Sequence, residues 1–111
     1  MHLRFKKEGT KLIVELSGEL DHHSAEEVRN NIDDKLEREK PNVLIMDFSG
    51  VTFMDSSGIG VVIGRYKKLS MREGRVLIAN INRSIRRVFD ISGLYKIVKV
   101  YDSVEEALKS V

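Results

Sequence analysis

The chain contains no cysteine, no glutamine and no tryptophan, and Pro41 is its only proline. The lack of cysteine excludes disulfide bonds, thiolate metal sites and cysteine nucleophiles together, and it fits a reducing compartment. No apolar run approaches the roughly 20 residues that a membrane-spanning helix needs. The charged first segment, Met1–Glu8, does not resemble a signal peptide. We therefore expect a cytoplasmic protein that has no membrane partner.

Neither sign of charge predominates, because the chain has 19 basic and 17 acidic residues and a net charge of only +2. Such a balance gives no electrostatic footprint for nucleic acid. The basic residues of the stretch 65–72 alternate with no aromatic residue other than Tyr66. We interpret Arg65, Lys67, Lys68 and Arg72 as a solvated helical face, and we expect no nucleic-acid partner.

The 111 residues, 41% of them hydrophobic, are sufficient for one ordinary core. There is no linker, repeat or low-complexity segment. The sequence therefore predicts a single domain over residues 1–111, monomeric when free.

Short apolar segments alternate with segments of helical periodicity along the chain. Residues 43–46 and 76–79 are continuous apolar runs, as in strands that are buried on both faces. Before them, two alternating segments predict a strand pair with its turn at Lys7–Lys11. The predicted order is β-β-α-β-α-β-α-β-α, with a last strand at 97–100. Alternation of this kind predicts an α/β fold, a mixed and mostly parallel sheet with helices packed on it.

Several boundaries of these elements follow from local signals. Ser24–Glu27 has the pattern of a capping box at a helix start, and Pro41 ends that helix near residue 40. The segment 18–23 is expected to connect a strand to this helix. The segment 49–54 is expected to be a loop, and Gly93 is expected to end a short third helix.

The most informative segment is Asp55–Gly60, between a buried strand and a helix. Loops in this position carry functional groups in α/β folds. Asp55 or Ser56 is a natural N-cap, which places Ser57 in the first turn. We expect the unpaired N–H groups and the helix dipole there to accept a negative charge, so that a phosphate on Ser57 would not unfold the domain.

The helix after Ser57 contains three glycines, each costing about 1 kcal/mol relative to alanine. For Gly58 and Gly60 we favour the close approach of a partner protein. For Gly64, close packing of helix on sheet and approach of a partner remain equally open. Val61 falls off the apolar stripe and is a further candidate for partner contact.

Two catalytic or ligand-binding interpretations compete with a binding module. A serine nucleophile elbow needs glycine two residues before the serine, where this chain has Asp55. A phosphate-binding loop needs G-x-G-x-x-G or G-K-[ST], and the spacing here is G-x-G-x-x-x-G. We therefore expect no enzyme and no cofactor, and we keep a nucleotide- or small-molecule-binding domain as the alternative function.

The only other candidate cluster is Asp21-His22-His23. Adjacent histidines rarely face one ion together, so we interpret both as solvated loop residues and predict no metal site. Asp21 is expected to cap the following helix or to face the Ser57 loop.

Four segments in register resemble the STAS-domain anti-sigma factor antagonists, and most closely their sporulation type, the anti-sigma-F factor antagonists. The segments are Gly18–His23, Phe53–Gly58, Gly64–Lys67 and Phe89–Leu94. The resemblance covers essentially the whole chain in order.

This resemblance implies a mechanism. The second serine of D-S-S-G, here Ser57, would be phosphorylated by an anti-sigma factor that is itself a serine kinase. The unphosphorylated protein would bind that kinase and release its sigma factor, and a serine phosphatase would reverse the modification. Asp21 would lie beside the serine loop, and the partner-binding residues would be Asp21, Asp55, Ser56, Gly58, Gly60 and Val61.

Overall fold

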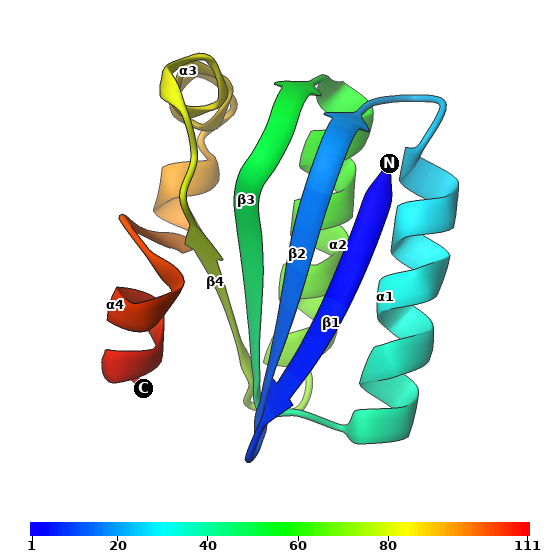
Figure 1. Ribbon diagram of the computed structural model, residues 1–111, viewed down its shortest axis with the longest axis vertical. Helices are drawn as coiled ribbons and strands as arrows, with labels where there is room; N and C mark the ends of the chain where they lie inside the picture. The colour runs from blue at the N-terminus through cyan, green and yellow to red at the C-terminus, as the bar shows by residue number, and fades with distance from the viewer.

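The computed structural model describes all 111 residues and joins five strands into one sheet in the order β1-β2-β3-β4-β5 (Figure 1). The strands are β1 (His2–Glu8), β2 (Lys11–Leu20), β3 (Val43–Met54), β4 (Arg75–Ala79) and β5 (Lys99–Tyr101). The β1–β2 pair is antiparallel and the other three pairs are parallel. The helices are α1 (Ala25–Glu39), α2 (Ser56–Ser70), α3 (Arg83–Ser92) and α4 (Val104–Lys109).

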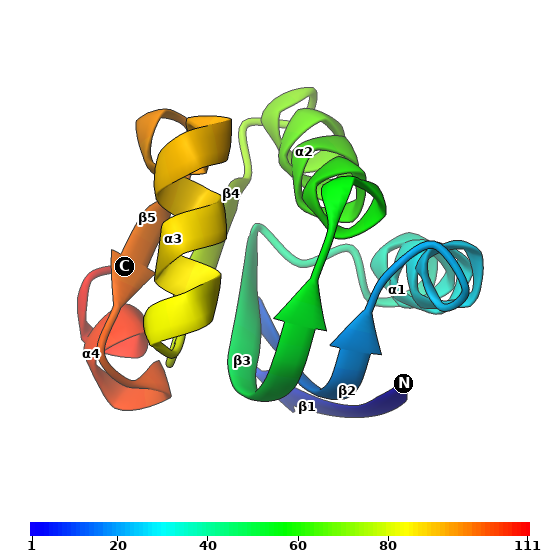
Figure 2. The ribbon, with the colours of Figure 1, turned by 90° about the horizontal axis from the view of Figure 1, so that it is seen from above.

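The helices cover the two faces of the sheet unequally (Figure 2). The first three helices pack on one face, over a core that includes Leu12, Val14 and Leu16 of β2. The last helix packs on the other face against a smaller cluster that includes Ile13 and Ile45. Neighbouring residues of β2 thus face opposite layers, as the pleat of a strand requires. None of the helices combines the length and the apolar character needed to cross a membrane.

The predicted α/β class, mixed sheet and element order are confirmed, with one added 3₁₀ turn at Leu94–Lys96. That turn moves the last strand. The N–H groups of Ile97 and Val98 donate to the carbonyl of Leu94, so β5 begins at Lys99 and not at residue 97. The predicted end of α3 at Gly93 is confirmed, because this residue adopts φ 80°, which favours glycine.

The two strands that lead to the serine loop are longer than predicted. The segment 49–54 is not a loop but the second half of β3, and residues 18–20 belong to β2, pairing as far as Leu20 with Met54. Gly50, which is typical of loops, is needed here inside a strand. A Cβ there would lie 2.5 Å from Ser17 Oγ, so this glycine marks a close approach of two strands.

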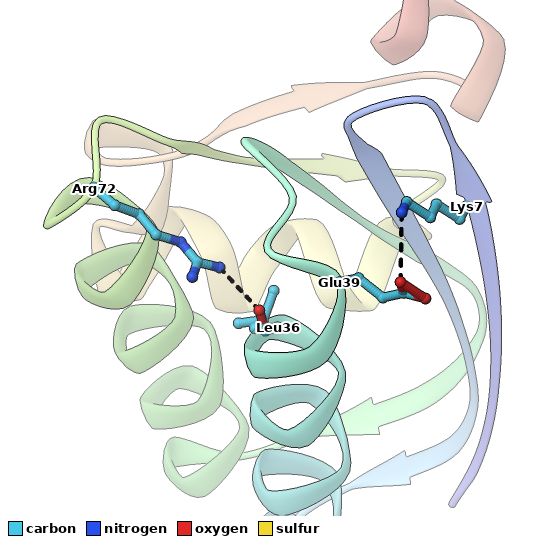
Figure 3. A network of polar contacts seen from close by, with 4 residues as sticks. All are labelled: Lys7, Leu36, Glu39 and Arg72. Carbon is cyan, nitrogen blue, oxygen red and sulfur yellow. Dashed lines mark hydrogen bonds and ion pairs between the residues drawn. The ribbon is translucent and has the colours of Figure 1, made fainter.

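Two crossovers of the same hand bring α1 and α2 side by side and parallel, with both N-termini at one end (Figures 1 and 2). Their C-terminal ends are tied together and to the sheet (Figure 3). Arg72 Nη2 donates to the Leu36 carbonyl at 3.4 Å, and Lys7 Nζ lies 3.4 Å from Glu39 Oε2. We call this C-terminal end of the helix pair, with its contacts from Arg72 to Leu36 and from Lys7 to Glu39, the closed end.

Candidate functional site

The serine loop begins where β3 ends, and Asp55 organises it. This residue is the N-cap of α2, and its Oδ1 accepts hydrogen bonds from the N–H groups of Ser57 at 2.8 Å and Gly58 at 3.3 Å. Its Oδ2 accepts from the N–H of His22 at 3.1 Å. One carboxylate therefore joins the start of α2 to the loop that precedes α1, and of the two predicted N-caps Asp55 is the correct one.

This cap changes the expected electrostatics of the helix start. We predicted that unpaired N–H groups would accept a phosphate on Ser57. The N–H groups of Ser57 and Gly58 are instead taken by Asp55, and the N–H of Ile59 donates to the Asp55 carbonyl. A phosphate on Ser57 would therefore meet a carboxylate and few free donors, and it would need a cation from another element.

Ser57 opens into a groove of about 360 Å³ between the N-terminal parts of α1 and α2. We call this groove the open end of the helix pair. Its lining residues are Ser57, Gly60 and Val61 from α2, and His22, Ala25, Glu26 and Arg29 from α1 and the loop before it. Ser57 is half-buried, whereas Ser56 is exposed and does not line the groove.

The two glycines of the first turns differ in their surroundings. A Cβ on Gly58 would lie 2.6 Å from the Leu20 carbonyl oxygen and 2.8 Å from Met54 Cγ. Gly58 is buried, so its close approach is to its own sheet, and the reason for which we assigned it to a partner was wrong. Gly60 is exposed and a Cβ there would meet nothing within 4 Å.

Two further positions on α2, Gly64 and Val61, can be judged from the space around them and from their burial. A Cβ on Gly64 would also meet nothing within 4 Å, so helix–sheet packing does not require glycine there. Val61 is only 4% exposed and belongs to the core, so the prediction that it falls off the apolar stripe was wrong. Its remaining exposed surface lines the groove.

The loop before α1 is organised by Asp21, whose Oδ1 accepts from the N–H groups of His23 and Ser24. The Asp21 carboxylate therefore holds its own turn, while the contact with the serine loop passes through the backbone of His22. The predicted capping box is wrong, because Ser24 makes no side-chain cap bond. Its hydroxyl instead donates to the Glu19 carbonyl at 2.7 Å.

Arg65 is buried, with only 4% of its surface exposed, which corrects its assignment to a solvated face. Its Nε lies 2.9 Å from Asp33 Oδ1 of α1, and Lys68 Nζ lies 3.5 Å from Oδ2 of the same carboxylate. The Nε–H does not point at that oxygen, so the contact is an ion pair without a hydrogen bond, and Nη1 also has no partner. Burial lowers the pKa of Arg65, which Asp33 partly offsets and the charge of Arg29 reinforces.

Sequence reasoning missed Arg29, whereas the prediction that His22 is a solvated loop residue is confirmed. Both are exposed, and both line the groove with Ser57. The sequence did contain a signal for Arg29. Ala25 and Arg29 are four residues apart, which places them on one face of α1, the face that lines the groove. No group of three or more His, Asp or Glu side chains lies close enough to hold a metal ion.

Comparison with known proteins agrees with this geometry. The STAS domain model matches residues 3–107. The chain is 41% identical over 97 residues to the anti-sigma F factor antagonist of Paenibacillus polymyxa, covering 87% of this chain and 83% of the relative. It is 31% identical over 85 residues to the anti-sigma-B factor antagonist of Listeria monocytogenes, covering 77% and 74%.

Solved structures extend the comparison to three dimensions. The anti-sigma factor antagonist SpoIIAA in its unphosphorylated form superposes with a TM-score of 0.85 at 32% identity, covering 98% of this chain and 95% of that chain. The Bacillus cell fate determinant SpoIIAA in its phosphorylated form gives a TM-score of 0.76 at 32% identity, covering 98% of both chains. The fold and the serine loop thus define a STAS domain. The chain belongs to the anti-sigma factor antagonists of the STAS family.

Proposed function

We propose that this protein is a phosphorylation-controlled binding switch with no catalytic activity of its own. In its unphosphorylated form it binds an anti-sigma factor that is also a serine kinase, and this binding releases the sigma factor. The kinase phosphorylates Ser57 and thereby ends the binding, and a serine phosphatase restores it. We assign it to a sporulation sigma factor, since its identity to the anti-sigma F antagonist exceeds that to the anti-sigma-B antagonist.

The observation that carries the proposal is the setting of Ser57. The hydroxyl lies in the first turn of a helix, half-buried at the edge of a groove, where a kinase can reach it and a partner can cover it. Phosphorylation adds about −1.5 to −2 charges. Covered by a partner and next to Asp55, these charges weaken binding by desolvation and repulsion. A coupling of about 1–3 kcal/mol changes affinity roughly 5–150-fold.

A relative also supports the proposal, because SpoIIAA has been described in both an unphosphorylated and a phosphorylated form. In our proposal the partner covers Asp21, Asp55, Ser56, Gly60 and the exposed edge of Val61. Gly58 contributes indirectly, because it allows α2 to start close to β2. No specific observation favours the alternative of a nucleotide-binding domain, since Asp55 occupies the amides that would bind a phosphate.

The direct test is phosphate transfer to the intact protein. We expect incubation with the sporulation anti-sigma kinase and ATP to add a single phosphate, which peptide mass spectrometry maps to Ser57. The Ser57→Ala variant should bind the kinase and accept no phosphate, and Ser56→Ala should be phosphorylated like the unaltered chain. A phosphate on Ser56, or transfer to the Ser57→Ala variant, would refute the assignment.

Binding measurements separate the switch from a disturbance of the fold. We expect Ser57→Asp to weaken kinase binding at least fivefold in titration calorimetry. Its melting temperature should stay within about 2 °C of the parent, because residue 57 lines an open groove and its charge stays hydrated while no partner covers it. A large fall in melting temperature would show that the charge acts on the domain itself.

A further inference from the structure

The fold leaves some charged side chains without an ion-pair partner. The open end contains one such group, the guanidinium of Arg29. This residue lines the groove with Ser57 and forms no ion pair, whereas Arg65, which lies deeper between the two helices, contacts the carboxylate of Asp33. The ionisable side chains that line the groove are His22, Glu26 and Arg29, and the Asp55 carboxylate lies beside it, accepting from the N–H of His22.

The surroundings of Arg29 favour an anion in the groove. Deeper between the helices, the buried Arg65 and the more exposed Lys68 share the single carboxylate of Asp33. The positive charge of Arg29 acts unfavourably on Arg65, and Nη1 of Arg65 has no partner. A negative charge at the mouth of the groove would reduce the repulsion between these two guanidinium groups.

The direction of the side chains supports the same conclusion. Side chains on a helix lean toward its N-terminus. Arg29 is in the second turn of α1, and the N-termini of α1 and α2 lie at the same end, so it leans toward the level of Ser57. On α2, the groove wall opposite Arg29 includes Gly60, which has no side chain to obstruct a phosphate.

We infer that Arg29 holds the phosphate of phosphorylated Ser57 within the groove, as an internal cation that completes the switch. This inference rests on the proposed function, because it presupposes phosphorylation of Ser57. Arg29 is a positioning residue here, with no part in the transfer of the phosphate. Its guanidinium supplies the donors that the α2 amides cannot, since Asp55 already occupies them.

Holding the phosphate inside the protein has a consequence for the switch. A free phosphoserine could be satisfied by a lysine or arginine of the partner, which would turn repulsion into attraction. A phosphate already paired with Arg29 lies across the groove and is less available to such a residue. The groove is then filled from within, and the partner loses the surface on which it docks.

The test uses full-length protein with phosphoserine encoded at position 57 during translation, so that it needs no kinase. The phosphorus-31 NMR shift, followed against pH, reports the second pKa of the phosphate, which is about 6 in free phosphoserine. We expect Arg29→Gln to raise this pKa by roughly 0.3–0.7 units, since a nearby cation favours the dianion. In about 1 M NaCl the difference should fall by more than half.

Two further variants act as controls. Arg38→Gln removes an exposed arginine from the other end of α1 and should leave the phosphate pKa within about 0.1 units. His22→Asn removes the imidazole that lines the same groove. If Arg29→Gln leaves the pKa unchanged, or if only His22→Asn raises it, Arg29 does not hold the phosphate.

Thermal unfolding gives a second readout. In the parent chain we expect phosphorylation to leave the melting temperature nearly unchanged, while in the Arg29→Gln background it should lower it by about 2–4 °C. The unphosphorylated variant should be at least as stable as the parent, because Arg29 is exposed, forms no ion pair and repels the charge of Arg65. Equal effects of phosphorylation in both backgrounds would overturn the inference. Kinase phosphorylation of Ser57 is a separate measurement, so its failure would affect only the proposed function.

Discussion

The two ends of the α1–α2 pair are built differently. At the closed end, Arg72 reaches the Leu36 carbonyl and Lys7 reaches Glu39 (Figure 3). At the open end, Arg29 has no partner and a groove separates the helices beside Ser57. Between them, the buried Arg65 of α2 pairs with Asp33 of α1. The difference shows that side-chain contacts hold the helices at one end, while the other end leaves polar groups unpaired.

The open end is nevertheless fixed on the side that faces the sheet. Gly58 lies against the Leu20 carbonyl, and Asp55 joins the helix start to His22. The arrangement therefore combines a rigid backbone with unpaired side chains. This combination suits the function proposed above, in which the site presents one serine in a defined position to a kinase and later accommodates a phosphate.

The largest expected effect on stability distinguishes two glycines at the start of α2, the buried Gly58 and the exposed Gly60. Gly58→Ala places a methyl group 2.6 Å from a backbone oxygen that cannot move freely, so we expect a loss of about 2–4 kcal/mol in the free energy of unfolding. Gly60→Ala meets no atom within 4 Å and should gain about 0.5–1 kcal/mol. Urea denaturation followed by circular dichroism measures both. Equal effects would mean that the open end is not packed on the sheet.

The next effect concerns the buried contact between the two ends. Asp33→Asn leaves Arg65 charged, buried and without a carboxylate, and we expect a loss of about 2 kcal/mol. The side chain of Asp33 is 23% exposed, which keeps the loss below that of a fully buried pair. The matched control is Asp34→Asn, which breaks only an exposed pair with Arg38 and should cost under about 0.5 kcal/mol. A smaller loss for Asp33→Asn than for the control would show that the pair does not hold the two helices together between their ends.

A smaller effect tests the junction of the two loops. Asp55→Ala removes the cap of α2 and the acceptor of the His22 N–H, and we expect a loss of about 1–2 kcal/mol. Asp55→Asn retains a capping oxygen and should recover most of this stability. Thermal unfolding of both variants, with hydrogen exchange at the amides of Ser57 and Gly58, provides the measurement. If these amides exchange at the parent's rate in Asp55→Ala, another group holds the helix start.

The smallest effect lies at the closed end. Lys7→Ala breaks an exposed ion pair with Glu39, and we expect a change of less than about 0.5 kcal/mol in the free energy of unfolding. Kinase binding, measured by titration calorimetry, should not change, because these residues lie at the opposite end of α1 from Ser57. A loss of binding in this variant would extend the interface along the whole helix pair.

The sequence was sufficient to predict the parts of the fold that depend on local patterns. The apolar run Val43–Met46, the end of α1 near Lys40 and the cap at Asp55 all depend on signals within a few residues. The second half of β3 was missed because residues 49–52 are a serine, a glycine, a valine and a threonine, a mixture that is common in loops. Its pairing with β2 compensates for this weak local preference, and such pairing cannot be read from the segment itself.

The candidate site shows the same division. Ser57 could be identified because capping residues and glycines surround it in the sequence. The burial of Arg65 could not, because its partner Asp33 lies on another helix. The function of Gly58 depends in the same way on Leu20, which belongs to the neighbouring strand. These contacts exist only after folding has brought separate helices and strands together.

The strands lie in the sheet in the order in which they leave the ribosome. All seven residues that line the groove fall between His22 and Val61, and the elements that carry them end at Ser70. The serine loop and the arginine opposite it are therefore synthesised as one continuous β-α-β-α segment, whose neighbouring elements can pair in sequence without long loop closure. The last 41 residues, which follow Ser70 in the chain of 111, complete the core but contribute no residue to the groove. Every residue of the groove is thus synthesised before the segment that completes the core.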